Sequence, residues 1–273
     1  MQKVSTLSVF CEHASQSSVN NIYDIIKYCM SNKITFIGPD NVDDLFQGKL
    51  PVGNYSLLTF DDGDESRFDD IAKLLQQKSI KAISFVIPLN SNFMELKTNF
   101  EYFLKYPDVF ELGSHSLTHT MSWISKERGT TITSPCLNYP HEEGPYTFYY
   151  GLVNKTILKF KDRLETDAEF NHRLYTEILF SKNWIEYVTG KECRFFAYPW
   201  GIHNPNIVRI VKDAGYKYGF SINVSDKSQF TIPRWYHNDI SKLKKEVLIN
   251  NVNVIPNRIA SQSDMDKKYG IWK

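Results

Sequence analysis

Short hydrophobic runs alternate along the chain with longer segments in which apolar residues recur every three or four positions. The short runs predict buried strands, and the longer segments predict amphipathic helices. The predicted strands cover residues 4–10, 34–37, 55–60, 82–87, 109–113, 194–198, 218–222 and 230–233. The predicted helices cover residues 19–30, 66–77, 95–105, 168–189, 205–214 and 240–249. About seven strand–helix units predict an α/β fold, in which parallel strands close into a distorted, TIM-like (β/α)7–8 barrel.

The alternation stops between about residues 121 and 166, where the chain is rich in Tyr, Pro, Gly and Thr. Long aperiodic segments in compact domains are usually functional or disordered. We therefore expect a single catalytic domain over residues 1–273 that carries an insertion at about residues 121–166. The aromatic residues of this insertion, Trp123 among them, predict a lid over a sugar, and a structural flap or a partner contact is the alternative.

Composition excludes several classes of partner. The chain of 273 residues has 32 basic and 31 acidic side chains, a net charge of +1, and no long run of either sign. A nucleic acid or an anionic membrane surface is therefore not an expected partner. No apolar stretch is long enough to span a membrane, and residues 1–10 lack the apolar region of a signal peptide. Together with four scattered cysteines, which are typical of reduced thiols, this predicts a cytoplasmic protein.

Residue types that bind metals follow two of the predicted strands. Asp61 and Asp62 end one hydrophobic run, and His115 and His119 follow another run about fifty residues later. Each pair alone has an ordinary explanation, as a turn or as separate surface histidines. The carboxyl ends of parallel strands, however, meet at one face of a barrel. There, two imidazoles and one carboxylate would bind a divalent metal and the second carboxylate would act as a base, as in a metal-dependent hydrolase.

Three motifs in this order resemble the polysaccharide deacetylase family, also known as the NodB homology domain or carbohydrate esterase family 4. They are TFDDG at residues 59–63, SHSLTH at residues 114–119 and RFFAYPWG at residues 194–201, and the resemblance spans roughly residues 50–235. Three ordered motifs at compatible spacing are far more specific than one. The resemblance implies a NodB-type barrel and a metal-dependent deacetylase. Its expected partner is an acetylated, amino-sugar-containing carbohydrate, with N-acetyl preferred to O-acetyl or N-formyl groups. The predicted cytoplasmic location favours a surface-polysaccharide precursor.

The resemblance also implies how the metal site works. Asp62, His115 and His119 would bind a divalent metal, most readily zinc, although cobalt and nickel accept the same ligands. The metal would lower the pKa of its water toward roughly 7 and polarise the amide carbonyl, and Asp61 would be the general base. Arg194 would orient Asp61 through a charge-assisted hydrogen bond.

Residues of the third motif and beyond it would contact the substrate. The resemblance implies that the backbone N–H of Tyr198 helps to hold the oxyanion of the reaction. It also implies that Pro199, Trp200 and Trp235 bind the substrate, with Trp235 forming a wall of the site. Structural packing is the alternative for Trp235.

One expected residue is not at its usual place. Family members carry, near the C-terminus, an apolar strand ending in Leu-x-x-His whose histidine is the general acid, whereas this chain has only His237 after Trp235. The first predicted strand also ends in a histidine, His13, and in a closed barrel it would neighbour the strand that bears Asp61. We therefore predict a circularly permuted arrangement with His13 as the general acid. A structural histidine is the alternative, and His141 is a rival acid.

Two other functions stay open. An amidohydrolase acting on a small non-sugar amide would use the same site. A carbohydrate-binding pseudoenzyme would explain the missing histidine, but a protein that only binds has no need of a base such as Asp61 beside the metal.

Overall fold

The computed structural model describes residues 4–14, 19–63, 67–89, 104–125, 131–135, 146–158, 163–222, 228–235, 247–249 and 252–254. Most of the helix predicted at 95–105 lies outside these ranges, and so do His141 and His237. No helix within them is long and apolar enough to cross a membrane.

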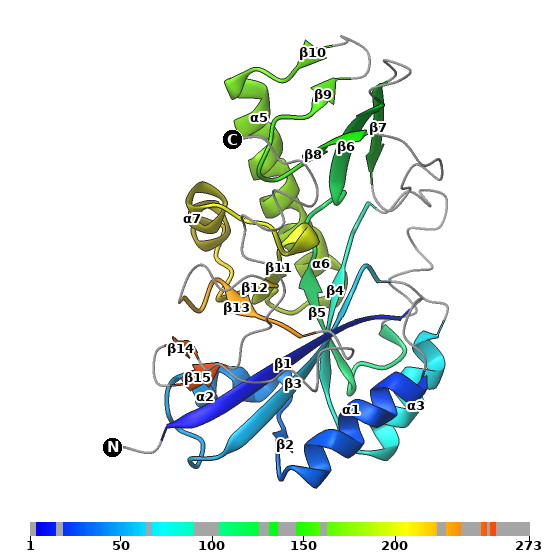
Figure 1. The fold of residues 1–273 in the computed structure, drawn as a ribbon, viewed down its shortest axis with the longest axis vertical. Coiled ribbons are helices and arrows are strands. Elements are labelled where there is room, and N and C mark those ends of the chain that lie inside the picture. The colour runs from blue at the N-terminus through cyan, green and yellow to red at the C-terminus, as the bar shows by residue number, and fades with distance from the viewer. Residues whose placement is uncertain are drawn as a thin grey trace.

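Parallel strands form the predicted barrel (Figure 1). They are β1 (Ser5–His13), β3 (Asn54–Asp61), β4 (Ala82–Val86), β5 (Phe110–Ser114), β11 (Phe195–Ala197), β12 (Tyr218–Ser221) and β13 (Ile232–Pro233). Their order is β13–β12–β11–β5–β4–β3–β1. The sheet then returns on itself, because Phe10 of β1 forms a parallel bridge with Trp235, just after β13. There Cys11 N donates to Trp235 O over 2.6 Å, and Trp235 N donates to Val9 O over 2.7 Å.

Apolar residues fill both the inside and the outside of the barrel, because successive residues of a strand face opposite sides. The buried apolar residues form two clusters, one inside the barrel (the inner cluster) and one between the strands and the surrounding helices (the outer cluster). In β1, Val9 belongs to the inner cluster and Phe10 belongs to the outer cluster. In β3, Leu57 and Leu58 divide in the same way. Strands buried on both faces read as continuous hydrophobic runs, which is the pattern that the sequence shows.

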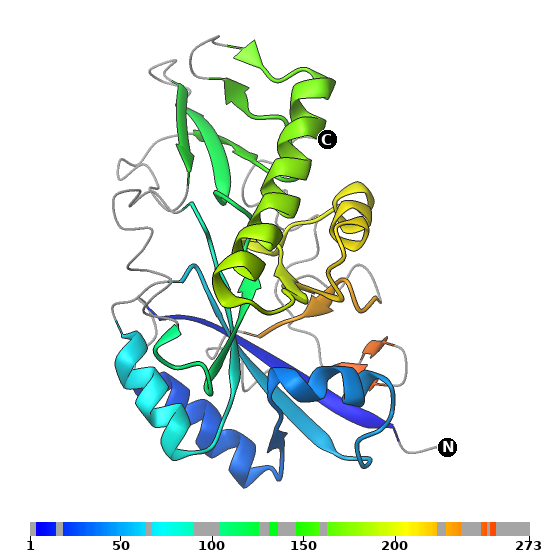
Figure 2. The same cartoon turned by 180° about the vertical axis from the view of Figure 1, so that it is seen from behind.

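Most of the helices pack against the outside of the strands (Figures 1 and 2). The predicted helix at 168–189 is confirmed, but the segment Thr176–Phe180 within it is π-helical and joins α5 to α6 in one continuous column (Figure 2). A capping box of Thr166 and Glu169 begins α5, and Gly190 ends α6 with φ 66°. The helices are α1 (Val19–Ser31), α2 (Val42–Phe46), α3 (Phe68–Gln77), α5 (Asp167–Tyr175), α6 (Ser181–Thr189) and α7 (Pro205–Asp213), with 3-10 turns at Pro39–Asn41 and Pro199–Gly201.

The insertion is more regular than expected. Its strands β6, β7 and β8 form an antiparallel sheet beyond the carboxyl ends of β4 and β5 (Figure 1), and β9 and β10 form a short hairpin. Threonine and tyrosine favour strands, which explains this order in the absence of a simple hydrophobic period. A partly buried ion pair, Arg173 Nε to Glu165 Oε1 at 2.6 Å, holds the end of the insertion against α5. The strands are β6 (Thr120–Ser125), β7 (Thr131–Pro135), β8 (Tyr146–Tyr150), β9 (Ile157–Leu158) and β10 (Arg163–Leu164).

The helix predicted at residues 240–249 is wrong at its C-terminal end. Strand β14 (Val247–Ile249) pairs with the antiparallel strand β15 (Val252–Val254), and β15 pairs in parallel with the start of β1. A short run of Val and Ile residues has no helical period of its own, so its pairing decides its structure. Strand β2 (Thr35–Phe36) extends the sheet in a similar way by pairing with β3.

Candidate active site

The two motifs that carry metal-binding residue types converge at the carboxyl ends of β3 and β5. Asp61 is the last residue of β3, and His115 directly follows β5. Because only β4 separates these strands, the side chains that follow them lie close together. Asp62, His115 and His119 each offer a ligand atom, and these atoms all lie within 4.8 Å of one another. All three residues are buried. The predicted convergence is therefore present, and the described residues provide a two-imidazole, one-carboxylate set.

His115 is held with one ring nitrogen facing the carboxylates. Its Nδ1 lies 2.9 Å from the carbonyl oxygen of Ala197. A carbonyl oxygen only accepts, so Nδ1 carries a hydrogen and Nε2 is the ring nitrogen that faces the carboxylates. Nε2 lies 3.6 Å from Asp62 Oδ1 and 3.7 Å from Asp61 Oδ2. A metal-ligating histidine is commonly fixed in this way, by a carbonyl on its far side.

His119 supplies the test of whether a metal suits this site. Its Nδ1 is buried and has no hydrogen-bond partner among the described residues. Burial, together with the nearby ring of His115, lowers the pKa of His119 well below its ordinary value, so the ring is neutral and able to coordinate. An unsatisfied buried polar atom typically costs about 1–3 kcal/mol. A bound cation would give the imidazole a partner, so the residues present fit a divalent metal.

The backbone of the site is strained. Six non-glycine residues in the described ranges have positive φ, and four of them lie at this site. Such conformations cost roughly 1–3 kcal/mol each and gather at functional sites. The four are Asp62 (φ 69°), Ser116 (φ 63°), His119 (φ 52°) and Trp200 (φ 61°).

Asp61 is paired with Arg234, a residue that the sequence analysis did not single out. The Nη1 atom of Arg234 lies 2.6 Å from Oδ1 of Asp61, and Nη2 lies 2.8 Å from Oδ2. Both residues are buried, and the thiol of Cys11 also donates to Oδ2 over 3.4 Å. Burial alone would raise the pKa of Asp61, but the charge and hydrogen bonds of Arg234, with a contribution from His115, lower it far below the ordinary carboxyl range. Asp61 is therefore ionised.

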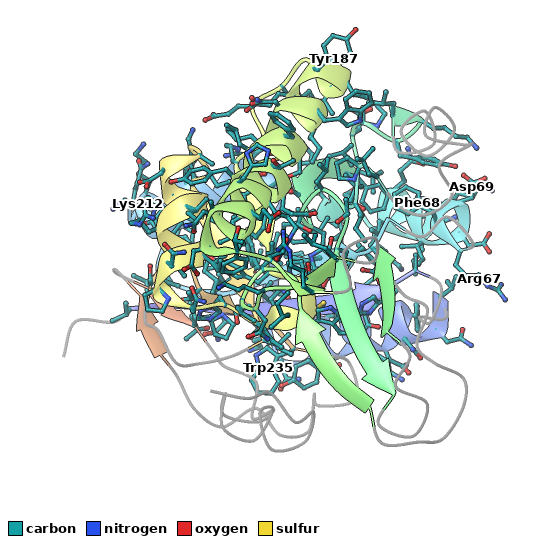
Figure 3. The ribbon with its side chains drawn as sticks, turned by 90° about the horizontal axis from the view of Figure 1, so that it is seen from above. Arg67, Phe68, Asp69, Tyr187, Lys212 and Trp235 are labelled. Atoms are coloured by element: carbon teal, nitrogen blue, oxygen red, sulfur yellow. The ribbon has the colours of Figure 1, made fainter. Side chains whose placement is uncertain are left out.

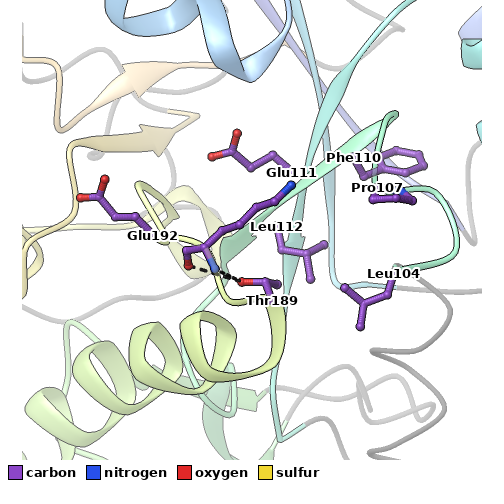
Figure 4. Close-up of a pocket in the computed structure, with 8 residues that line it drawn as sticks. Leu104, Pro107, Phe110, Glu111, Leu112, Thr189 and Glu192 are labelled. Atoms are coloured by element: carbon purple, nitrogen blue, oxygen red, sulfur yellow. Dashed lines mark hydrogen bonds between the residues drawn. The ribbon is translucent and has the colours of Figure 1, made fainter.

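The prediction that Arg194 orients Asp61 is wrong. Arg194 directly precedes β11, so it lies at the amino end of the barrel, opposite Asp61. Its Nη1 lies 2.9 Å from Asp43 Oδ2, and its Nη2 lies 2.9 Å from Glu111 Oε2. Figure 4 shows Glu111 near the start of β5, beside a small pocket that Thr189 and Glu192 also line. This pocket is thus at the other end of the barrel from the metal-binding residue types.

The predicted oxyanion contact of Tyr198 is also wrong. Its backbone N–H donates to the carbonyl oxygen of Phe220 over 3.0 Å, so that hydrogen is used within the barrel. The phenol of Tyr198 is buried and donates to the carbonyl oxygen of Phe230 over 2.8 Å. The residue is a structural link between β11 and β12.

The three predicted substrate-binding residues differ in position. Trp200 is half-buried, and its ring lies 5.1 Å from that of His119. Pro199 is buried at the start of the 3-10 turn Pro199–Gly201, which also contains Trp200. Trp235 is fully buried in the outer core cluster, so it does not form an accessible wall, contrary to the prediction. Among these residues, Trp200 is the one that lies beside the candidate ligands.

His13 lies at the predicted position beside Asp61. It ends β1 and is the register partner of Asp61 on β3. Its Nε2 lies 3.5 Å from Asp62 Oδ2, and its side chain keeps 20% of its surface exposed. The first strand therefore brings a partly accessible imidazole to the two aspartates, and the role of that imidazole stays a prediction.

The chain is similar to a known protein family in sequence and to solved proteins in structure. Residues 51–219 match the family described as polysaccharide deacetylase. The BpsB deacetylase domain from Bordetella bronchiseptica is similar in structure, with a TM-score of 0.63 at 19% identity over 84% of this chain and 95% of that one. A de-N-acetylase from Aggregatibacter actinomycetemcomitans is also similar in structure, with a TM-score of 0.58 at 14% identity over 97% of both chains. For IcaB from Ammonifex degensii the TM-score is 0.56, at 15% identity over 97% of this chain and 96% of that one. No curated protein sequence matches the chain.

Proposed function

Because the chain belongs to the polysaccharide deacetylase family, we propose that it is a divalent-metal-dependent enzyme that removes N-acetyl groups from the amino sugars of a carbohydrate, releasing acetate. The observation that carries this proposal is the meeting of Asp62, His115 and His119 beside a second, ionised carboxylate, Asp61. A protein that only bound a metal would have no use for that second carboxylate. An N-acetyl group is proposed in preference to an O-acetyl or N-formyl group.

Asp62, His115 and His119 would hold the metal, which we propose to be zinc. Cobalt and nickel accept the same donors. When bound, such an ion lowers the pKa of a coordinated water toward roughly 7 and polarises a carbonyl. The Nδ1–H of His115, held by the Ala197 carbonyl, fixes the tautomer that leaves Nε2 for the ion.

Asp61 would take the proton from the attacking water. Its carboxylate has about four lone-pair positions, and Arg234 uses one on each oxygen. The bidentate contact keeps the carboxylate charged and fixes its plane, so that a remaining lone pair stays directed toward the reacting atoms. In this proposal Arg234 has the positioning role that the sequence had suggested for Arg194.

His13 would give a proton to the leaving amine. Its Nε2 lies 3.5 Å from Asp62, a proposed metal ligand, and its partial exposure leaves it accessible to substrate. Since β1 places this histidine beside β3, the first strand would supply the acid that family members carry near the C-terminus. That this order reflects circular permutation stays a prediction.

A groove beside the site supports a carbohydrate chain over a small amide. It has a volume of about 670 Å³ and reaches Leu117, which lies between His115 and His119 in the sequence. Exposed aromatic residues suit the apolar faces of sugar rings, and three of them lie on this groove at helical spacing (i, i+4, i+7). Figure 3 shows Tyr187 directed away from the body of the protein. The aromatic residues are Phe180, Trp184 and Tyr187.

The decisive experiment is a substrate panel with the zinc-loaded protein. We expect acetate from N-acetylated glucosamine oligosaccharides and none from the Asp61→Asn variant, whose fold would be checked by circular dichroism. Release from simple acetamides but not from sugars would favour the small-amide hydrolase. Metal binding without acetate release from any substrate would favour a carbohydrate-binding protein. The cytoplasmic location expected from the sequence also stays a prediction.

A further inference from the structure

The turn that carries the two histidines rests on one buried carboxylate. Glu177 belongs to the π-helical segment Thr176–Phe180 and is buried. Its Oε2 accepts the backbone N–H of Thr118 over 2.9 Å, and its Oε1 accepts the hydroxyls of Thr118 over 2.5 Å and Thr120 over 3.2 Å. Its main-chain carbonyl accepts the N–H of Leu117 over 2.9 Å. Glu177 thus holds the chain on both sides of His119.

This contact matters because His119 and Ser116 have positive φ, of 52° and 63°. A non-glycine residue stays in such a conformation only where its surroundings hold it there. Glu177 supplies that restraint for the segment around His119. The N–H of His119 adds a further bond, to Ser116 Oγ over 3.0 Å.

The same helical column holds the start of the turn through hydroxyls. The N–H of Ser116 donates to Ser114 Oγ over 3.2 Å, and Ser114 Oγ donates to Ser181 Oγ over 2.8 Å. The hydroxyls of Ser181 and Tyr216 both donate to the carbonyl oxygen of Ile178, over 2.9 Å and 3.0 Å. Short π-helical segments inside α-helices often occur at functional sites, and this one faces the histidine turn.

The hydrogen bonds of Glu177 distinguish it from the other buried carboxylate of this region. Glu165 is paired with Arg173, whereas Glu177 has no basic partner among the described residues. A buried carboxylate without a cation is costly unless its hydrogen bonds compensate. The bonds that compensate here all come from the turn between the two histidines and from the residue that follows it.

We propose that Glu177 is a positioning residue for the metal ligand His119 and acts through Thr118 and Thr120. This rests on the proposed function, because it takes Asp62, His115 and His119 as the metal site. Removing the carboxylate would let the turn relax from its strained conformation and would move His119 out of the ligand set. Groups that orient metal ligands typically contribute about 10- to 100-fold to affinity.

The test measures metal binding rather than turnover. Apo-protein would be titrated with Co²⁺ and Zn²⁺ by calorimetry, and the visible absorption of the Co²⁺ form would be recorded for the wild type, Glu177→Gln and Glu177→Ala. We expect both variants to bind about 10- to 100-fold more weakly, with a changed Co²⁺ spectrum. The control is Glu165→Gln, which removes another buried carboxylate beside α5. It should lower the melting temperature and leave the Co²⁺ spectrum of the folded protein unchanged.

A second pair covers the case in which the Glu177 variants do not fold. Thr118→Ser keeps the hydroxyl that donates to Glu177, and Thr118→Val removes it. We expect the affinity of Thr118→Ser to stay near the wild-type value and that of Thr118→Val to fall. Wild-type affinity and an unchanged spectrum in folded Glu177→Gln or Thr118→Val would overturn the positioning role alone. A wild-type chain that bound neither ion would instead overturn the proposed metal site, and this inference with it.

Discussion

The guanidinium group of Arg234 binds both carboxylate oxygens of Asp61, at 2.6 Å and 2.8 Å, although 173 positions separate the two residues. The contact exists because the barrel closes. Trp235, the neighbour of Arg234, bridges to Phe10 of β1, and β1 lies against β3, which ends at Asp61. Closure of the sheet therefore does two things at once: it buries the edges of β1 and β13, and it delivers a cation to the proposed base.

Arg234→Lys should impair turnover much more than it impairs binding. A lysine carries the charge but not the planar fork, so Asp61 would lose its fixed orientation. We expect kcat to fall on the order of 10²-fold, a large part of what a general base contributes, with a small change in KM. Steady-state kinetics on an N-acetylated oligosaccharide would measure this.

The matched control for that change is Arg194→Lys. Arg194 binds Glu111 and Asp43 at the other end of the barrel. Its replacement should therefore lower the melting temperature and leave kcat close to the wild-type value. Equal losses of kcat in both variants would mean that Arg234 acts only through stability.

The Asp61–Arg234 pair should also make stability depend on pH. The pKa of Asp61 is lowered in the folded protein, so folding favours the ionised form. Its contribution is complete above the unfolded-state pKa of about 3.9, and it is lost as the pH falls below that value toward the folded-state pKa. Urea unfolding of metal-free wild type and Asp61→Asn should differ by roughly 3–5 kcal/mol near neutral pH, since Asn leaves the buried cation unpaired. The difference should shrink below about pH 4, and a difference that stayed constant down to lower pH would contradict the assigned ion pair.

The sequence predicted that the candidate metal-binding residues would meet because they follow two strong strand patterns. Asp61 and His115 stand directly after hydrophobic runs, and parallel strands in one barrel bring such positions to the same face. The same rule explains why the prediction for Arg194 is wrong, because residues that precede parallel strands lie at the opposite end of the barrel from residues that follow them. Arg194 precedes its strand, which places it at the opposite face. Arg234 directly follows the strand predicted at residues 230–233, so the same rule places it at the face of Asp61.

Other features depend on contacts that no local pattern records. Glu177 lies in a long helical segment and looks like any acidic helix residue until Thr118 is placed beside it. The segment Val247–Ile249 is a strand because it pairs with β15, and β15 in turn pairs with β1 near the start of the chain. The resemblance predicts an oxyanion contact for the N–H of Tyr198 because it concerns residue types alone. The hydrogen bond of that N–H to Phe220 depends on the register of β11 and β12.

His13→Ala should separate two kinds of leaving group. An amine must be protonated as it leaves, whereas the phenolate of an aryl acetate leaves without a proton. We expect N-acetyl hydrolysis to fall on the order of 10²- to 10⁴-fold while aryl acetate hydrolysis and Zn²⁺ affinity change little. Unchanged N-acetyl hydrolysis would remove His13 from the mechanism. Parallel loss of both reactions and of Zn²⁺ affinity would point instead to a role in holding Asp62.

Trp184→Ala should distinguish a polymer from a short substrate. Trp184 and Tyr187 lie on the groove that reaches Leu117, and their ring centroids are 6.2 Å apart, so a sugar chain that followed this groove would meet both rings. Loss of one such contact should raise KM for a long N-acetylated oligosaccharide about tenfold, equivalent to ~1.4 kcal/mol, and leave kcat and the KM of a disaccharide unchanged. Tyr23→Ala is the control, because Tyr23 is also an exposed aromatic residue but lies on α1 rather than on this groove. If Trp184→Ala and Tyr23→Ala behave alike on the long substrate, the chain does not follow this groove, and the preference for a polymer over a small amide loses its structural support.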